Sequence, residues 1–125
     1  MTDMKPINEM DRCRKWIEDA LEYSGGTHTF QDIADGVAEG RMQLWPAPRG
    51  CIVTEIVVYP RKKYLNLFLA GGELDQLLDM NESITAWAKQ WGCDGGMMSG
   101  RSGWKKPLEK LGWKVMHVHY VKELE

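Results

Sequence analysis

The stretch CIVTEIVVYPRKKYLNLFLAGG, residues 51–72, determines the fold class of this chain. Its two halves, Cys51–Tyr59 and Tyr64–Ala70, are rich in β-branched and aromatic residues, a composition typical of strands. Only four residues separate the two halves, so we expect the strands to pair antiparallel as a hairpin. Gly71-Gly72 interrupts the strand pattern and predicts a turn at this point.

Helices are predicted on both sides of this hairpin. Asn8–Tyr23 has a single apolar stripe at helical spacing, and we expect Trp16 and Ile17 on that stripe to lie inside, against the sheet. A second helix is predicted at Phe30–Glu39, with Thr29 as its N-cap. The other expected elements are a strand at Met42–Trp45, a long helix at Glu73–Trp91, a weak strand at Gly95–Ser99, a short helix at Trp104–Leu111 and a final strand at Trp113–Val121.

Composition places the chain among ordinary globular domains. Its 125 residues are 43% hydrophobic and 27% charged, which excludes a disordered chain, a coiled coil or a collagen-like repeat and predicts one domain over residues 1–125. No apolar run is long enough for a membrane span, and the start MTDMKPINEMDR lacks a signal-peptide pattern, so we expect a cytoplasmic protein. The net charge of -2 argues against a nucleic-acid partner. The cysteines, which form no C-x-x-C pair and are expected to be reduced and mostly buried, are Cys13, Cys51 and Cys93.

The element order resembles the GNAT fold, the fold of the acyl-CoA N-acyltransferases. It is an α/β order (α-α-β-β-β-α-β-α-β) around a mixed sheet covered by helices. GRSGWKKPLEKLGWKV, residues 100–115, resembles the short fourth helix of the family, which ends in a glycine-aromatic pair, here Gly112-Trp113. This passage is also similar to small GNAT-like proteins encoded by tailed bacteriophages. The likeness extends over about residues 8 to 124.

The resemblance implies a site for acetyl-CoA at the turn before the long helix. In the family a Gln/Arg-x-x-Gly-x-Gly/Ala loop holds the pyrophosphate at a helix N-terminus. Gly71 and Gly72 occupy that place here and are the candidate cofactor-binding residues. The basic leading residue and the family spacing are absent, and Glu73 and Asp75 put carboxylates where a diphosphate would bind. We therefore expect Gly71-Gly72 to be a turn in which glycine is needed for the backbone conformation, with no phosphate bound there.

The catalytic groups that the family implies are only partly present. The usual general acid is a Tyr four residues before the glycine-aromatic pair, and Leu108 stands at that position. Glu55, in the middle of a core strand, is the candidate general base. The alternative for Glu55 is a structural carboxylate on the less covered face of the sheet.

Two further groups of residues could carry function. Arg101, Trp104 and Lys105 follow a glycine-rich segment and combine residue types that dominate binding surfaces. The alternative is that Trp104 only seals the end of the sheet. His117 and His119 would lie on one face of the final strand. They could bind a metal together, or they could be two exposed polar residues without a ligand.

Two hypotheses about function follow. The favoured one is a degenerate, non-catalytic GNAT-fold protein without a cofactor, which acts through protein contacts as a phage-particle or host-interaction component. The alternative is an N-acetyltransferase that moves an acetyl group from acetyl-CoA to an amine. The missing phosphate loop and the missing Tyr favour the first hypothesis.

Overall fold

The computed structural model describes residues 8–124, so what the sequence predicts for residues 1–7 and Glu125 lies outside the described residues. Its four strands form one mixed sheet in the order β1-β2-β3-β4. The first three strands pair antiparallel and β3 pairs parallel with β4, which confirms both the hairpin and the mixed sheet. The strands are β1 (Met42–Ala47), β2 (Gly50–Val58), β3 (Lys63–Gly72) and β4 (Gly95–Met97).

Several predicted strand ends are wrong, and the strand expected at Gly95–Ser99 already ends at Met97. β1 does not stop at Trp45 but continues through Pro46, which pairs with Cys51. A proline is tolerated here because β1 is an edge strand and needs no outward N–H bond. β3 likewise continues through Gly71 and Gly72, so the glycines end a strand instead of forming a turn.

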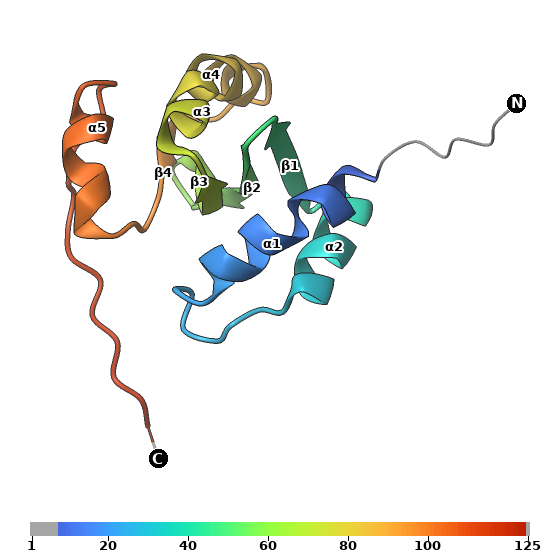
Figure 1. Cartoon of the computed structure of the whole chain (residues 1–125). Helices are drawn as coiled ribbons and strands as arrows, with labels where there is room; N and C mark the ends of the chain where they lie inside the picture. Colours follow the sequence, from blue (N-terminus) through green and yellow to red (C-terminus); the bar gives the residue numbers. More distant parts are fainter. Residues whose placement is uncertain (1–7, 125) are drawn as a thin grey trace, which may run out of the picture.

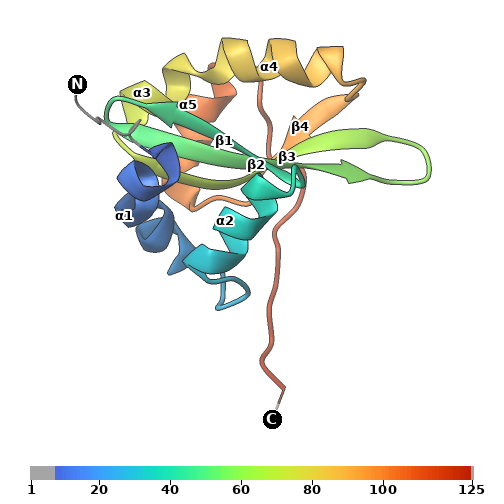
Figure 2. The same cartoon turned by 90° about the vertical axis from the view of Figure 1, so that its right-hand side faces the viewer.

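The helices α1 (Glu9–Leu21) and α2 (Phe30–Ala38) cover one face of the sheet (Figures 1 and 2). Ile17 is 1% exposed, as predicted, whereas Trp16 is partly buried at the margin of the same core. The buried residues of this first core are Cys13, Ile17, Leu21, Ile33, Met42, Cys51, Val53 and Leu69.

The predicted N-cap of α2 is present. Asp32 N–H donates to Thr29 Oγ1 (3.3 Å), and Thr29 N–H donates to Asp32 Oδ2 (2.8 Å), which together form a capping box. At the other end Gly40 has φ +79°, a left-handed conformation that closes the helix.

The opposite face carries α3 (Leu74–Asp79) and α4 (Asn81–Gln90), where the sequence predicts one helix. The break lies at Met80, whose N–H bonds the Leu77 carbonyl three residues back, so the last turn of α3 tightens and α4 starts anew. The buried residues of this second core are Ile52, Leu65, Leu77, Ile84 and Ala88. None of the helices in residues 8–124 has the length and apolar character that a membrane crossing requires.

The carboxyl-terminal part departs most from the prediction. The 3-10 turn η1 (Ser102–Trp104) precedes the short helix α5 (Lys105–Glu109), close to the predicted helix. The predicted final strand at Trp113–Val121 is not formed, because this segment finds no neighbouring strand and extends away from the body (Figure 1). The observed order is therefore α-α-β-β-β-α-α-β-α, without a terminal strand.

Candidate functional site

The strands β3 and β4 pair over a short distance and then separate. Their register joins Tyr64 to Gly95 and ends with Asn66 opposite Met97. β3 continues to Gly72, paired with β2 on its other side. Among the described residues no strand therefore lies beside the outer edge of β3 from Leu67 onward. An extended ligand that carries amide groups can bond such an edge in the manner of an added strand.

A β-bulge lies directly beyond the point of separation. Val53 pairs with Leu69 and Thr54 with Leu67, so Phe68 is the extra residue. Phe68 and Leu69 both contact the first core as a result. The imidazole of His28 packs edge-on against the Phe68 ring, with centroids 4.8 Å apart. Bulges of this kind redirect side chains and are frequent beside active sites.

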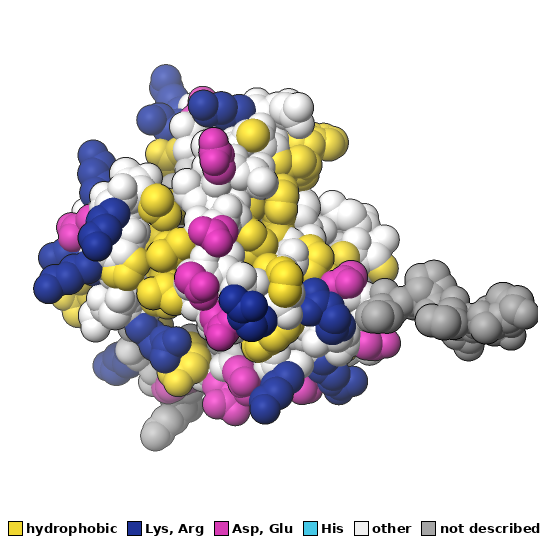
Figure 3. Space-filling model, turned by 45° about the horizontal axis from the view of Figure 1, so that its top comes forward, with side chains coloured by type: hydrophobic (Ala, Val, Ile, Leu, Met, Phe, Trp, Pro, Cys, Tyr) yellow, Lys and Arg dark blue, Asp and Glu magenta, His cyan; other side chains and the backbone are white. Residues whose placement is uncertain are grey.

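A groove lies between α3 and α5, the helices that follow β3 and β4 along the chain. Its volume is about 380 Å³, and Figure 3 shows apolar side chains in this depression, with basic side chains on one side of it and acidic ones on the other. Lys106 and Lys110 come from α5 and the turn that follows it, one helical turn apart. The residues that line the groove are Leu74, Leu78, Lys106, Pro107, Lys110 and Leu111.

The glycine pair before α3 is required by close packing. A Cβ on Gly71 would lie 2.6 Å from the Trp16 carbonyl oxygen. Gly72 has φ +109°, and a Cβ there would lie 2.3 Å from the Cα of Gly50. Both distances are below any normal contact, so the backbone alone demands glycine at these positions.

The start of α3 is acidic, and one basic side chain lies beside its two carboxylates. Arg49, in the β1–β2 turn, pairs with Glu73 and lies 3.8 Å from the Asp75 carboxylate. The hydrogen bond that Arg49 Nε donates to the Glu73 carboxylate raises the pKa of the Arg49 guanidinium. No sequence pattern reveals this role of Arg49, because the turn that carries it lies more than twenty residues before α3.

Glu55 lies near the point where the strands separate. It pairs with Met42 on β1 and Asn66 on β3, and because Met42 belongs to the first core, Glu55 lies on the α1/α2 face. The Asn66 side-chain amide donates to Glu55 Oε2 (3.1 Å), and the residue is half-buried. Asn66 is also the last residue of β3 that pairs with β4. The carboxylate is thus held one strand away from the free edge.

The structure separates the residues of the predicted contact cluster. Trp104 packs against the second core, as expected if it seals the end of the sheet. Arg101 is exposed, and its guanidinium lies 4.2 Å from the centre of the Tyr23 ring at the end of α1. Lys105 is exposed on α5. His117 and His119 are exposed in the terminal segment and not on a sheet face.

A polar depression near α2 is a weaker candidate. It measures about 400 Å³ and contains three carboxylates. Each already has a partner: Asp32 accepts from Thr29, Asp35 from Gln31 and Glu39 from Arg41. These groups stabilise α2 and its ends, so the depression offers no free donor set for a ligand.

Solved structures share this arrangement. No protein-family model matches the sequence, and a search of curated protein sequences finds no relative. A structure described as a probable acetyltransferase superposes with a TM-score of 0.69 at 8% identity, over 97% of this chain and 95% of the other. The chain has the GNAT fold.

Two further structures show the same likeness. Glucosamine-6-phosphate N-acetyltransferase from Arabidopsis thaliana gives a TM-score of 0.64 at 15% identity, with 94% of this chain and 95% of that one covered. An aminoglycoside acetyltransferase from an uncultured soil sample, in complex with sisomicin, gives 0.67 at 7% identity, with 94% and 91% covered. At such low identity the likeness defines the GNAT fold alone.

Proposed function

We propose that this GNAT-fold chain binds a coenzyme A thioester and transfers its acyl group to an amine. The observation that carries the proposal is the separation of β3 from β4 after Asn66 and Met97, beside a groove that Lys106 and Lys110 rim. This reverses the order of preference that the sequence alone suggests. The structural neighbours named as acetyltransferases support the same choice.

The described residues fit such a ligand. A coenzyme A thioester is long and narrow, with amide groups near the sulfur and phosphates at the other end. The free edge of β3 offers backbone partners to the amides, and the apolar walls of the groove can cover the chain between them. Lys106 and Lys110 provide positive charge for phosphate. We place the phosphates toward these lysines, because Glu73 and Asp75 repel them at the start of α3.

Glu55 is the group we propose as general base. An ammonium must lose a proton before its nitrogen can attack the acyl carbonyl, and a half-buried carboxylate one strand away from the free edge can accept that proton, directly or through one water. The thioester, when bound, supplies that carbonyl and a thiol leaving group. A thiol with a pKa of about 8.5 can leave as the thiolate, so Leu108 at the usual acid position does not prevent the reaction.

The proposal is tested by calorimetric titration with acetyl-CoA. We expect micromolar binding for the wild type and at least tenfold weaker binding for Lys106→Ala with Lys110→Ala. The control is Lys105→Ala, which removes an equal charge from the same helix outside the groove and should bind normally. An absence of binding by the wild type at millimolar acetyl-CoA would contradict the proposal.

A second titration separates binding from chemistry. Glu55→Gln keeps the size of the side chain and a partner for Asn66, so acetyl-CoA affinity should be unchanged. Thiol release with a panel of amines should fall by about 10²–10⁴-fold, as expected for loss of a general base. An unchanged rate would remove Glu55 from the mechanism and leave the binding site intact.

The second candidate is a non-catalytic contact protein, such as a phage-particle or host-interaction component. The observation that favours it is the pairing of Arg49 with Glu73, which uses up the basic group nearest the usual phosphate position. Under this hypothesis acetyl-CoA does not bind, while Arg101→Ala with Lys105→Ala abolishes association with a purified partner. Both residues are exposed, so the melting temperature of that variant should stay within a few degrees of wild type.

A further inference from the structure

The tip of the β2–β3 hairpin projects from the body of the molecule. Figure 2 shows the hairpin extending past the ends of the neighbouring helices. Val58 and Lys63 are the last paired residues, and the Tyr59 N–H closes the turn by donating to the Lys62 carbonyl oxygen (2.7 Å). β3 runs from this tip to α3, so the tip lies at the opposite end of that strand from the candidate groove.

Apolar side chains are exposed on both faces of the hairpin at its tip. The Tyr59 ring packs against the Tyr64 ring on the α1/α2 face, with centroids 6.1 Å apart. Val58 lies on the α4 face, because it pairs with Lys63, whose Nζ donates to the Trp91 carbonyl oxygen at the end of α4. Val58 is 73% exposed, Trp91 56% and Tyr59 45%. A group of exposed apolar residues at one place indicates an interaction site.

Basic side chains surround these apolar ones. Arg61, Lys62 and Lys63 follow one another in the turn, and Lys89 lies in the last turn of α4. Within residues 8–124, Arg61 and Lys62 form no ion pair, so their charges are available to a partner. We call this surface the tip patch; it consists of Val58, Tyr59, Arg61, Lys62, Lys63, Lys89 and Trp91.

The base of the tip is held in place by the segment that follows α4. The Asp94 N–H donates to the Lys63 carbonyl oxygen (2.7 Å), and the Lys63 N–H donates to Asp94 Oδ2 (2.9 Å). The carboxylate of Asp94 thus accepts from the backbone of the hairpin. These reciprocal bonds fix the hairpin beside the end of α4, so the tip patch is formed before any partner binds.

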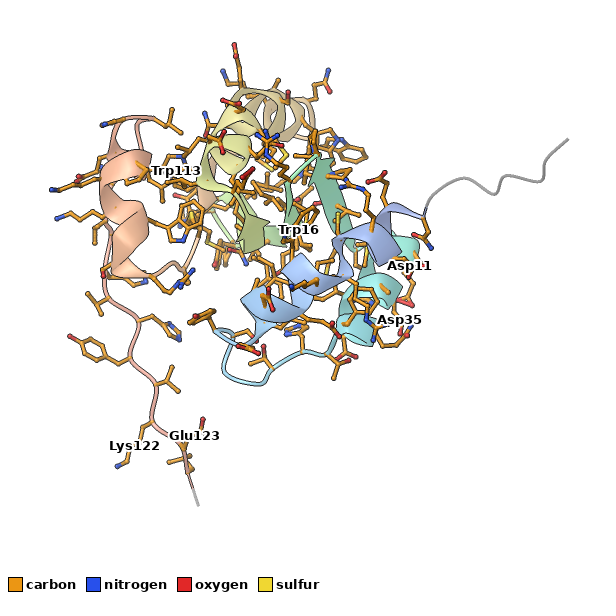
Figure 4. The ribbon with its side chains drawn as sticks, in the orientation of Figure 1. Asp11, Trp16, Asp35, Trp113, Lys122 and Glu123 are labelled. Atoms are coloured by element: carbon orange, nitrogen blue, oxygen red, sulfur yellow. The ribbon has the colours of Figure 1, made fainter. Side chains whose placement is uncertain are left out.

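Charge is distributed unevenly between the tip and the helices α1 and α2. Residues 8–41 carry eight acidic and four basic side chains, whereas residues 58–64 carry three basic and no acidic ones. Figure 4 shows Asp11 on α1 and Asp35 on α2, on the side of the molecule where these helices lie. α1 lies over the far end of β3, next to Gly71. A negatively charged surface would therefore attract the tip and repel the helices, which orients the molecule.

We propose that the tip patch binds the surface of a lipid bilayer that contains anionic lipids. Lys and Arg side chains are attracted to anionic head groups, and Trp and Tyr rings are enriched at the level of the head groups. Apolar groups on both faces of a projecting hairpin favour this partner, because lipid can surround a projection whereas a flat protein surface or a nucleic-acid base contacts one face. Binding of this kind needs no membrane-spanning helix.

The first test is sedimentation of the full chain with vesicles. We expect binding to phosphatidylcholine vesicles that contain about one third phosphatidylserine, and at least about tenfold weaker binding to phosphatidylcholine alone. Arg61→Ser with Lys62→Ser should weaken binding to the anionic vesicles by at least about tenfold. The matched control, Lys105→Ser with Lys114→Ser, removes the same charge from exposed positions elsewhere and should bind like the wild type. Wild-type protein that does not bind anionic vesicles, or equal loss in both variants, would overturn the proposal.

The second test concerns the apolar part of the tip patch. Val58→Ser with Tyr59→Ser should weaken vesicle binding, while the melting temperature stays within a few degrees of wild type because both side chains are exposed. Val118→Ser with Tyr120→Ser is the control, since it replaces the same residue types at exposed positions outside the tip patch and should bind normally. Normal binding by the Val58 and Tyr59 variant would show that the tip does not enter the head-group layer and would overturn the proposal.

The third test distinguishes lipid from nucleic acid. A single-stranded oligothymidylate, added at the same phosphate concentration as the anionic vesicles, should leave most of the wild-type protein on the vesicles. Complete displacement by the oligonucleotide would identify nucleic acid as the preferred partner and overturn the proposal. All three tests are made without acetyl-CoA, so their results do not depend on the proposed acyl transfer.

Discussion

Gly71 on β3 lies directly beneath the carbonyl of Trp16 on α1, with only 2.6 Å between that oxygen and the place of a Cβ. The closeness of α1 to the sheet is therefore set by a residue without a side chain. A methyl group here would push against backbone, which cannot rotate away as a flexible side chain can. The same glycine is the next-to-last residue of β3, the strand whose free edge forms part of the candidate site.

Gly71→Ala should destabilise the protein by about 1–3 kcal/mol, the usual cost of overpacking a closely packed contact. Chemical denaturation of the wild type and the variant measures this difference. Gly103→Ala is the control, because a Cβ there meets nothing within 4 Å. Equal stability of the two variants would show that α1 can move away from β3 at no cost.

Ile17→Ala should cost about 2–5 kcal/mol, because the side chain is 1% exposed and its removal leaves a cavity in the first core. Trp16→Ala should lie at or below the lower end of that range, since its ring is only partly buried. Thermal melts compare both with Lys15→Ala, an exposed position on the same helix. If the Ile17→Ala variant has the same melting temperature as the Lys15→Ala control, α1 is not part of the core.

Thr54 is the buried polar residue to test. Its hydroxyl accepts from Trp45 Nε1 (3.0 Å) and donates to Gln43 Oε1 (2.8 Å), and it is fully buried. Thr54→Val keeps the shape but leaves both partners without a bond, which costs about 1–3 kcal/mol. Trp45→Phe in the Thr54→Val background should recover part of this loss, and a double-mutant cycle measures how much.

Asp32 should make stability depend on pH under acidic conditions. The hydrogen bonds from the backbone and then the side chain of Thr29 lower the pKa of the Asp32 carboxyl below its ordinary 3.8. A lowered folded pKa means that the stabilisation is complete above pH 3.8 and is lost as the pH falls through the folded value. The melting temperatures of wild type and Asp32→Asn should therefore differ at pH 7 and converge as the pH falls below the ordinary pKa of the carboxyl. A difference that stays constant over this range would assign the effect of Asp32 to something other than its charge.

The cysteines should react in two classes. Burial raises the pKa of the Cys13 and Cys51 thiols, so at pH 8 very little of either is the reactive thiolate. Cys93 is only half-buried. A thiol reagent should modify about one cysteine per native chain and all three after unfolding in guanidinium. Fast reaction of all three in the native state would mean that the first core opens readily.

Local patterns were sufficient for much of the fold. The β-branched runs on either side of Pro60–Lys63 predict the hairpin, and the apolar stripe through Ile17 predicts α1 with its buried face. Thr29 and Asp32 predict the start of α2 because the capping bonds join residues three apart. In each case the residues that make the structure are neighbours in sequence, so the sequence displays the interaction itself.

The remaining features of the fold and of the candidate site depend on contacts between residues that are distant in sequence. Residues 113–121 alternate like a strand, yet a strand forms only when another one lies beside it, and alternation does not reveal that partner. The sequence pattern at Gly71 and Gly72 predicts a turn. Their role depends instead on Trp16 and Gly50, which lie in close contact with them in the folded chain. The sequence by itself thus determined the two helices before the sheet, the hairpin and the likeness to a GNAT order. Only the tertiary structure decided where β3 and β4 separate, what surrounds Glu55 and which strand edge stays free, because these depend on contacts between segments far apart in the chain.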